Sequence, residues 1–403
     1  MEFLRLACRE EIYKTYFHLF KPLGSKQVSV FEAYKHFASK DVYATENIPY
    51  FPRSSVDGFA VKASNTVGAT PSSPVLLRFV GEVSMAERPK LTISTGETCR
   101  IWTGGWIPDG ADSVVMLEDA NIVGEFVEIY SPCATGENVL QIGDDVRQGG
   151  LVISKGKEIR AQEIGMLNAL GIQEIEVARK PRVLIIPTGN ELVEPWQVPE
   201  NGKIREINSF IVTFLIKNYC EVAERHPVVR DDQKVLFEVI KSVFAAYDLL
   251  LLSGGSSKGA GDFAVRAIEE FEDSEVLFHG VRVSPGKPTF FAKIKEKPII
   301  GLPGHPGSCF VSNYLFVLPL VKYLQGALEF VPSPSGFIKA GTDIPSKAGR
   351  EEWVRVIKVN SNITPLFSES AILSSLVNAS GLIRIPENKE GIHKGEEVEF
   401  YEL

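Results

Sequence analysis

The sequence of 403 residues is poor in cysteine and histidine and has no long apolar run. The five cysteines are far apart, and neither a C-x-x-C pair nor a zinc-ligand spacing occurs, which excludes a disulfide framework and a cysteine-pair zinc site. Residues 309–324 form the longest apolar stretch, but Asn313, Pro319 and Lys322 interrupt it, so it is too short to cross a bilayer. We therefore expect a protein of a reducing, cytoplasmic compartment without membrane contact.

An excess of positive charge is also absent. The formal net charge is −8 and no basic block occurs, so nucleic acid is not an expected partner. An acidic surface repels polyanions. Any phosphate site would therefore be local, built from backbone N–H groups and a few lysines, or helped by a bound cation.

The length predicts two to four domains, and the residue pattern changes along the chain. Apolar residues at helical spacing predict a helix over residues 3–20, and residues 27–43 are expected to form a second short helix. From about 45 to 150, short β-rich runs alternate with glycine and proline turns, which predicts a β-dominated module. Its expected strands are 75–83, 98–103, 113–117 and 126–130.

Residues 151–180 read as a bridge with a short helix before Gly171. From 181 to 327, buried strands alternate with helices, which predicts a doubly wound, mainly parallel sheet that binds ligands beyond the carboxyl ends of its strands. A linker at 332–336 precedes a final β module. The expected strands of the α/β segment are 183–186, 223–229, 249–252 and 299–302, and its helices are 209–219, 232–246, 262–271 and 306–324.

Two of these helices begin beside good capping residues. We expect Asn208 or Ser209 to cap the first helix and Asp231 or Asp232 to cap the second, since their side chains accept hydrogen bonds from the first free N–H groups.

A glycine-rich loop, residues 253–262, follows the apolar run 249–252 and opens into a helix. Glycines let the backbone approach an anion closely, and the N–H groups at a helix start point toward it. Lys258 can add a positive charge. The spacing fits neither of the two common nucleotide-binding patterns, so a tight turn with a solvated lysine stays an alternative. The glycines are Gly254, Gly255, Gly259 and Gly261.

Four glycine-bearing loops, 187–191, 253–262, 284–288 and 302–308, are expected at the carboxyl ends of strands, where they could rim one crevice. Two of them carry an acid, Glu191 or Asp262. An isolated carboxylate repels a phosphate, whereas Mg²⁺ binds one or two carboxylates together with substrate phosphates. Glu191 and Asp262 are therefore candidate magnesium ligands, with a helix cap as the alternative.

The β-rich module offers weaker candidates. Asp57 precedes Gly58, which is above all a hairpin signal. The pair Asp144-Asp145 is typical of a solvated turn. The stretch Thr103-Gly104-Gly105 follows the strand residues Arg100-Ile101-Trp102. These residues alone do not predict a site.

Taken together, the motifs resemble those of the MoeA / gephyrin E-domain family, which inserts molybdate into molybdopterin, and they keep its order over nearly the whole chain. They are Ser55-Val56-Asp57-Gly58-Phe59-Ala60, Arg100-Ile101-Trp102-Thr103-Gly104, Gly136-Glu137-Asn138-Val139, Gly143-Asp144-Asp145-Val146, Thr188-Gly189-Asn190-Glu191-Leu192, Ser253-Gly254-Gly255, Pro285-Gly286-Lys287-Pro288 and Leu302-Pro303-Gly304-His305-Pro306.

The resemblance implies a multidomain protein of an α/β domain plus all-β modules. The α/β domain would be a doubly wound, MogA-like molybdopterin-binding domain. The implied parts are an N-terminal helix (1–22) packing on the α/β domain, an elongated linker domain (23–44 and 149–180), a β-rich domain (45–148), the α/β domain (181–327) and a C-terminal β-barrel (328–403).

The resemblance also implies roles for individual residues. The implied catalytic residues are Asp57, Thr103, Asp145, Glu191, Asp231 and Asp262, with Glu191 and Asp262 holding Mg²⁺. The implied phosphate and pterin contacts are Ser253, Gly254, Gly255, Ser256, Lys258, Gly259, Ser284, Lys287, Pro303 and Pro306.

The chain departs from the family pattern at several positions. Ser284 stands where lysine is usual, and Lys258 could restore that charge from another loop. Asn190 stands where aspartate is common, and His305 lies in a changed loop. These departures leave molybdate and tungstate open as the oxyanion.

The implied reaction is a Mg²⁺-dependent insertion of molybdate or tungstate into adenylyl-molybdopterin with release of AMP, by a cytoplasmic homodimer whose subunits share the active site. Contact with the molybdopterin adenylyltransferase is expected. Three rivals stay open: adenylylation of molybdopterin, a molybdopterin-binding scaffold, and a general nucleotide-phosphate hydrolase.

Overall fold

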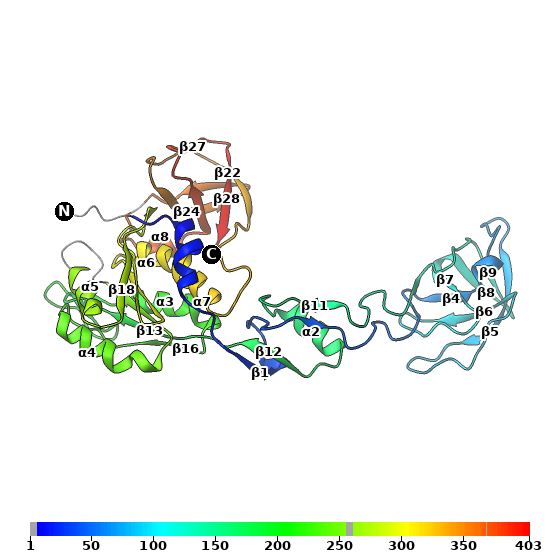
Figure 1. Ribbon diagram of the computed structural model, residues 1–403. Helices are drawn as coiled ribbons and strands as arrows, with labels where there is room; N and C mark the ends of the chain where they lie inside the picture. The colour runs from blue at the N-terminus through cyan, green and yellow to red at the C-terminus, as the bar shows by residue number, and fades with distance from the viewer. Residues whose placement is uncertain (1–5, 255–260, 368) are drawn as a thin grey trace. The chain divides into compact units, whose positions relative to one another are not determined.

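The computed structural model describes residues 6–254, 261–367 and 369–403 (Figure 1). The chain divides into two compact units. The larger contains Met1–Lys40, Lys155–Ala161 and Glu174–Leu403, and the smaller contains Asp41–Ser154 and Gln162–Gln173. No helix in the described ranges is long and apolar enough to cross a membrane.

The centre of the larger unit is a six-stranded sheet of order β16-β13-β17-β21-β20-β18. The first four strands run parallel, and β20 runs antiparallel to both of its neighbours, β21 and β18, so the predicted doubly wound, mainly parallel sheet is confirmed. The strands are β16 (Val222–Arg225), β13 (Arg182–Pro187), β17 (Leu249–Ser253), β21 (Lys297–Leu302), β20 (Phe290–Ile294) and β18 (Ser274–His279).

Helices cover both faces of this sheet, because successive strand residues point to opposite sides. In β17, Leu249 and Leu251 pack in one apolar core and Leu250 and Leu252 in another. Figure 1 shows α4 and α5 on one side and α3, α6 and α7 on the other. The helices are α3 (Asn208–Ile216), α4 (Gln233–Val243), α5 (Gly261–Glu269), α6 (Pro306–Ser312) and α7 (Leu318–Tyr323), the last two joined by a π-helical turn (Asn313–Val317).

The first helical segment runs from α1 (Arg9–Glu11) through a π-helical turn to Leu19. It buries Ile12 and Phe17 in the same core as α3 and α6. The predicted N-terminal helix is thus confirmed over these residues.

The second predicted helix, residues 27–43, is wrong. β1 (Ser25–Ser29) pairs antiparallel with β12 (Glu174–Ala178), and only Val30–Glu32 forms a single 3₁₀ turn. Ser29 and Glu32 form a capping box on this turn, which signals a helix start, but Lys35 has a positive φ of 60° and ends the helical conformation. Pairing with a distant strand therefore decides the conformation of this segment.

The predicted bridge helix is confirmed as α2 (Ala161–Ala169). In the smaller unit, β2 (Val42–Tyr43) pairs antiparallel with β11 (Leu151–Ile153), and β3 (Arg53–Ser54) pairs with β10 (Val139–Leu140).

The C-terminal module closes into a five-stranded barrel in the order β24-β25-β22-β28-β26, because β26 also pairs with β24. A short strand, β19 (Val283–Ser284), adds to β24 from the α/β segment. The barrel strands are β22 (Gly336–Ala340), β24 (Glu351–Val359), β25 (Asn362–Pro365), β26 (Gly381–Ile385) and β28 (Glu397–Glu402).

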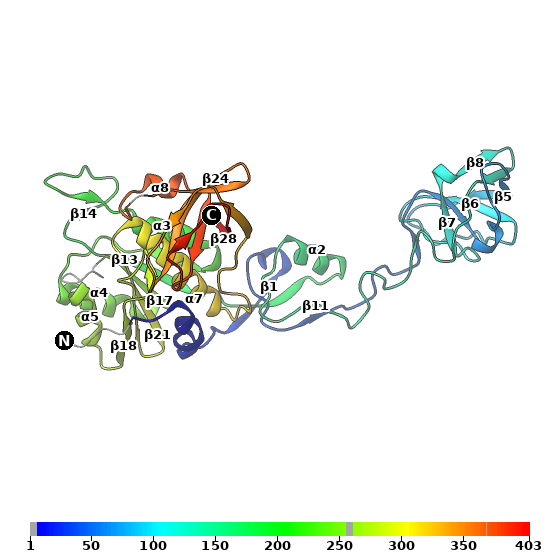
Figure 2. The same ribbon diagram turned by 90° about the horizontal axis from the view of Figure 1, so that it is seen from above.

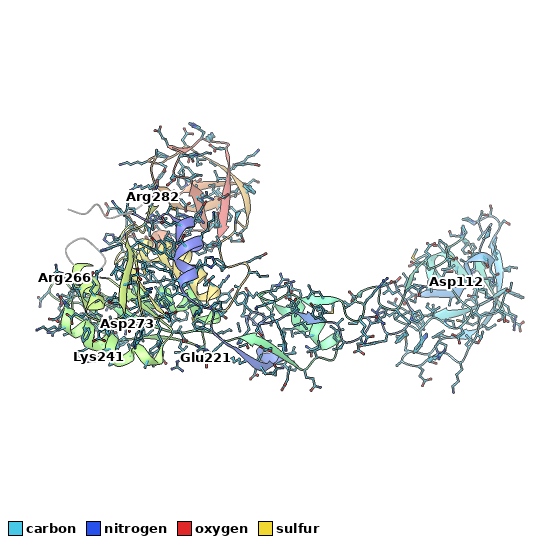
Figure 3. All side chains as sticks on the ribbon, in the orientation of Figure 1. Asp112, Glu221, Lys241, Arg266, Asp273 and Arg282 are labelled. Atoms are coloured by element: carbon cyan, nitrogen blue, oxygen red, sulfur yellow. The ribbon has the colours of Figure 1, made fainter. Side chains whose placement is uncertain are left out.

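The main sheet of the smaller unit has the order β7-β4-β6-β5-β9-β8, seen from above in Figure 2. All four strands predicted for this module are present. Asp112, labelled in Figure 3, accepts hydrogen bonds from the Ala63 N–H at 2.7 Å and the Ser113 hydroxyl at 2.9 Å. The strands are β4 (Gly58–Val61), β5 (Val75–Glu82), β6 (Glu97–Ile101), β7 (Ser113–Met116), β8 (Ala120–Val123) and β9 (Phe126–Ile129).

Candidate functional site

A pocket of about 700 Å³ lies in the larger unit, at the carboxyl ends of β13, β17 and β21. This is the edge at which a doubly wound sheet binds its ligands. The lining residues on which the argument rests are Thr188, Glu191, Ile204, Arg205, Glu206, Asn208, Asp231, Ser253, Gly254, Pro303, His305 and Pro306.

Six of the predicted site residues line this pocket: Glu191, Asp231, Ser253, Gly254, Pro303 and Pro306. Ser284 and Lys287 are not in its lining, although the neighbouring Pro288 is. Gly255, Ser256, Lys258 and Gly259 lie outside the described residues. Asp262 belongs to the first turn of α5, and its side chain is outside the described part of the chain.

The floor of the pocket depends on a glycine at position 254. Gly254 has a φ of +99°, and a Cβ there would lie 2.2 Å from the carbonyl oxygen of Thr188. The N–H of Thr188 donates to the carbonyl of Ser253 at 2.7 Å. The ends of β13 and β17 therefore approach more closely than any side chain at position 254 would allow.

Two carboxylates, Glu191 and Asp231, meet in the pocket. The Asn190 N–H donates to Asp231 Oδ2 and the Asp231 N–H to Asn190 Oδ1, each at 3.3 Å. The other oxygen of Asp231 is buried and has no hydrogen-bond partner among the described residues. Burial, and to a lesser extent the charge of Glu191, raises the pKa of Asp231 above its usual value. This arrangement favours a cation or a proton at Asp231.

A short two-stranded flap, residues 192–205, covers part of the pocket. β14 (Leu192–Val193) pairs in parallel with β15 (Ile204–Arg205), and the Ile204 N–H donates to the Glu191 carbonyl at 2.8 Å. The flap brings Ile204 and Arg205 to the pocket. Sequence reasoning missed both residues, because a loop that binds back on itself leaves no periodic pattern.

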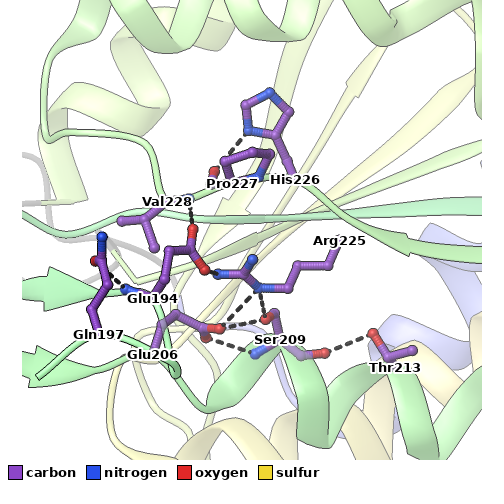
Figure 4. A network of polar contacts seen from close by, with 9 residues as sticks. All are labelled: Glu194, Gln197, Glu206, Ser209, Thr213, Arg225, His226, Pro227 and Val228. Atoms are coloured by element: carbon purple, nitrogen blue, oxygen red, sulfur yellow. Dashed lines mark hydrogen bonds and ion pairs between the residues drawn. The ribbon is translucent and has the colours of Figure 1, made fainter.

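A largely buried ion-pair network holds the flap to the sheet (Figure 4). Arg225, at the end of β16, binds Glu194 of the flap at 2.6 Å and Glu206 at 3.3 Å. Its Nε also donates to the Ser209 hydroxyl at 2.9 Å. Since Glu206 lines the pocket, the network fixes one wall of it.

The predicted helix caps need correction at α3. Its N-cap is Ile207, and Asn208 and Ser209 are helical. The Ser209 N–H donates to the Glu206 carboxylate at 2.8 Å, so the Glu206 side chain accepts a hydrogen bond from the first turn of α3, as an N-cap side chain would. The amide of Asn208 donates to the Gly304 carbonyl at 2.6 Å.

Of the two acids offered as the cap of α4, Asp232 is the N-cap. Its Oδ1 accepts from the N–H groups of Lys234 and Val235. Asp231 is thereby left to face the pocket.

The smaller unit brings Asp57 and Thr103 together. Both the N–H and the hydroxyl of Thr103 donate to Asp57 Oδ1 at 2.7 Å. The backbone hydrogen bond from Thr103 is the main reason why the pKa of Asp57 lies below its usual value. Asp145 is exposed, and its N–H donates to the Ile48 carbonyl at 3.0 Å.

Three family models match consecutive parts of the chain. They describe the MoeA N-terminal region (domain I and II) over residues 8–171, a "probable molybdopterin binding domain" over 184–323, and the MoeA C-terminal region (domain IV) over 338–403. The chain belongs to the MoeA family. Nearly all of the pocket lining falls within 184–323.

Known proteins of this family align over almost the whole chain. A Methanocaldococcus jannaschii protein named for molybdopterin biosynthesis is 35% identical over 94% of this chain and 92% of its own length. A molybdopterin molybdenumtransferase of Staphylococcus aureus is 29% identical over 93% of this chain and 90% of its own. The crystal structure of the molybdopterin biosynthesis MoeA protein of Pyrococcus horikoshii OT3 is 30% identical, covers 99% of this chain and 100% of its own, and superposes with a TM-score of 0.83. The family resemblance, the expected class of molybdenum cofactor enzyme and the multidomain fold class are thus confirmed.

Proposed function

We propose that this MoeA-family chain is a molybdopterin molybdenumtransferase, which inserts molybdate or tungstate into adenylyl-molybdopterin and releases AMP. The observation that carries the proposal is the pocket at the carboxyl edge of the sheet, which Glu191 and Asp231 line together with Ser253 and Gly254. An S. aureus relative that aligns with nearly all of this chain is named for this activity.

Mg²⁺ fits the donor set of this pocket. Asp231 has a buried oxygen without a hydrogen-bond partner among the described residues, and it lies close enough to Glu191 for the two charges to interact. Two such carboxylates beside a phosphate need a positive charge between them. Glu191 and Asp262 would hold the ion with Asp231 beside them, and the ion would supply Lewis acidity to the phosphate oxygens.

The protein's own part in the reaction would be binding and orientation. The Gly254 backbone and the 255–259 loop would cradle the phosphates, with Ser253, Pro303 and Pro306 lining the pocket beside them. Ser284 and Lys287 would contact the ligand from the neighbouring loop. Transfer of an oxyanion to sulfur atoms of the substrate needs no protein nucleophile. The role of these residues would therefore be to hold the substrate in position.

We further propose that the enzyme is a cytoplasmic homodimer. The family resemblance supports an active site completed by Asp57, Thr103 and Asp145 of the partner subunit, and a contact with the adenylyltransferase that supplies the substrate. The five free cysteines support a reducing compartment.

The test is AMP release from purified adenylyl-molybdopterin with Mg²⁺, run with molybdate, with tungstate and with neither. The wild-type chain should release AMP only with an oxyanion, and the more effective anion identifies the metal. Glu191→Gln should slow turnover by about 10²-fold or more while it keeps pterin binding, because a neutral amide binds Mg²⁺ more weakly than a carboxylate does.

Glu200→Gln is the matched control, since Glu200 is an exposed acid of the flap outside the pocket lining. It should leave turnover unchanged. Pterin binding without AMP release under any condition would favour a scaffold. Formation of adenylyl-molybdopterin from ATP would favour the adenylyltransferase, and hydrolysis of simple nucleotides would favour the hydrolase.

A further inference from the structure

A second pocket, of about 350 Å³, lies at the opposite edge of the α/β sheet. Lys180 precedes β13 and Cys220 precedes β16, so the pocket is at the amino ends of strands whose carboxyl ends point to the first pocket. Its lining is Tyr34, Lys35, Lys180, Lys217, Asn218 and Cys220.

One lysine of this pocket is already paired with a carboxylate. Lys35 forms an ion pair with Glu158 at 2.5 Å, and the Tyr219 hydroxyl donates to the other oxygen of Glu158 at 3.4 Å. Glu158 is therefore already paired, and neither Lys180 nor Lys217 has an ion-pair partner among the described residues.

Lys180 and Lys217 are held in place without an acid. Lys180 donates to the Asn218 carbonyl at 2.8 Å, and the Lys217 ammonium lies 4.2 Å from the centre of the Phe214 ring. Burial, with the charge of Lys26 adding to the effect, lowers the pKa of Lys180.

This concentration of positive charge is unusual in a chain whose net charge is −8. A half-buried ammonium group without a counter-charge destabilises the fold, and nearby lysines add repulsion. An anion that accepts the free ammonium protons would remove both costs.

We propose that this pocket binds a small tetrahedral oxyanion of the phosphate type, with Lys180 and Lys217 as its charged contacts. Inorganic phosphate, molybdate and the head of a phosphate monoester share this chemistry. The site is distinct from the pterin pocket, because the two lie at opposite edges of the sheet.

The rate of lysine acetylation in the full-length protein, measured for each lysine by mass spectrometry, tests whether an oxyanion binds at this pocket. At a phosphate concentration about ten times its dissociation constant, acetylation of Lys217 should slow about tenfold, since only about one site in eleven is then empty. Molybdate and glycerol phosphate, run as separate arms, identify which oxyanion binds most tightly. Lys234, an exposed lysine of α4, should react at an unchanged rate in every arm.

The variant Lys180→Met should abolish protection of Lys217 and, by removing repulsion, should leave the thermal stability without phosphate equal to or above that of wild type. Lys234→Met should keep the protection. The proposal would be overturned if chloride at matched ionic strength slowed the acetylation of Lys217 equally, or if the oxyanions also slowed the acetylation of Lys234. Protection of Lys217 by an acidic peptide alone would also overturn it. So would a loss of stability in Lys180→Met combined with no slowing of Lys217 acetylation by any of the three oxyanions in the wild type.

Discussion

At the scale of single residues, two adjacent acids have opposite roles. Asp232 caps α4 through two backbone N–H groups, whereas Asp231 faces the pocket with a buried oxygen that no described residue satisfies. Asp232 stabilises its helix, and Asp231 is held where its charge is unfavourable. Residues kept in such positions are typical of functional sites.

We predict that Asp231→Asn slows AMP release strongly, by about tenfold or more, and raises the melting temperature at neutral pH. The folded-state pKa of Asp231 is raised, so ionisation in the folded protein costs stability once the pH exceeds the unfolded value. The gain in stability should therefore shrink as the pH falls through the raised pKa of Asp231, and it should vanish below the pKa of an ordinary aspartate. Thermal unfolding across the acid range measures it.

Asp232→Ala is the control for this prediction. It removes a cap and should lower stability by about 0.5–2 kcal/mol, with turnover nearly intact. A stability loss in Asp231→Asn as large as that of Asp232→Ala would show that Asp231 is structural.

At the scale of elements, the pocket lies where the carboxyl ends of several strands come close together. β13 and β17 approach through Gly254, and the flap closes over them through the Arg225 network. Neither contact could be predicted from the segment that makes it, because each depends on a partner far away in the chain.

We predict that Gly254→Ala distorts the pocket and costs several kcal/mol, since its Cβ would overlap the Thr188 carbonyl and its φ is strained for alanine. Pterin binding should fall with stability. Gly165→Ala is the control: Gly165 lies within α2 with open space around it, so alanine should raise stability by up to about 1 kcal/mol. Equal stability of both variants would mean that the approach of β13 and β17 is not required.

At the scale of the whole molecule, the chain forms two units with separate cores. The termini both belong to the larger one, where Arg9 binds Glu351 of the barrel at 2.7 Å. The boundaries predicted for the five parts of the chain stay predictions.

We predict that a destabilising substitution in one unit leaves the stability of the other unit unchanged. In Gly58→Ala the new Cβ would lie 2.0 Å from the Val115 carbonyl, so the sheet of the smaller unit should lose stability. Hydrogen exchange should accelerate in residues 41–154, while the core strand β17 of the larger unit keeps its protection. Faster exchange in β17 to the same extent would show that the units unfold as one.

The sequence was sufficient for much of the fold because its signals are local. The four-leucine run of β17, the helical spacing before Phe20 and the short alternating runs of the β-rich module each describe one element and its burial. The motifs predicted Glu191 and Gly254 for the pocket in the same way, since glycines and acids that follow buried strands gather at one edge of a parallel sheet.

The tertiary structure decided whatever depended on distant partners. Residues 27–43 look helical, but β1 pairs with β12, about 150 residues further along the chain. The choice between Asp231 and Asp232 rested on where one helix begins, and Ile204 and Arg205 reach the pocket only because a flap folds back over it. Local composition determines which elements can form, whereas long-range pairing and burial determine where they lie and which side chains share a site.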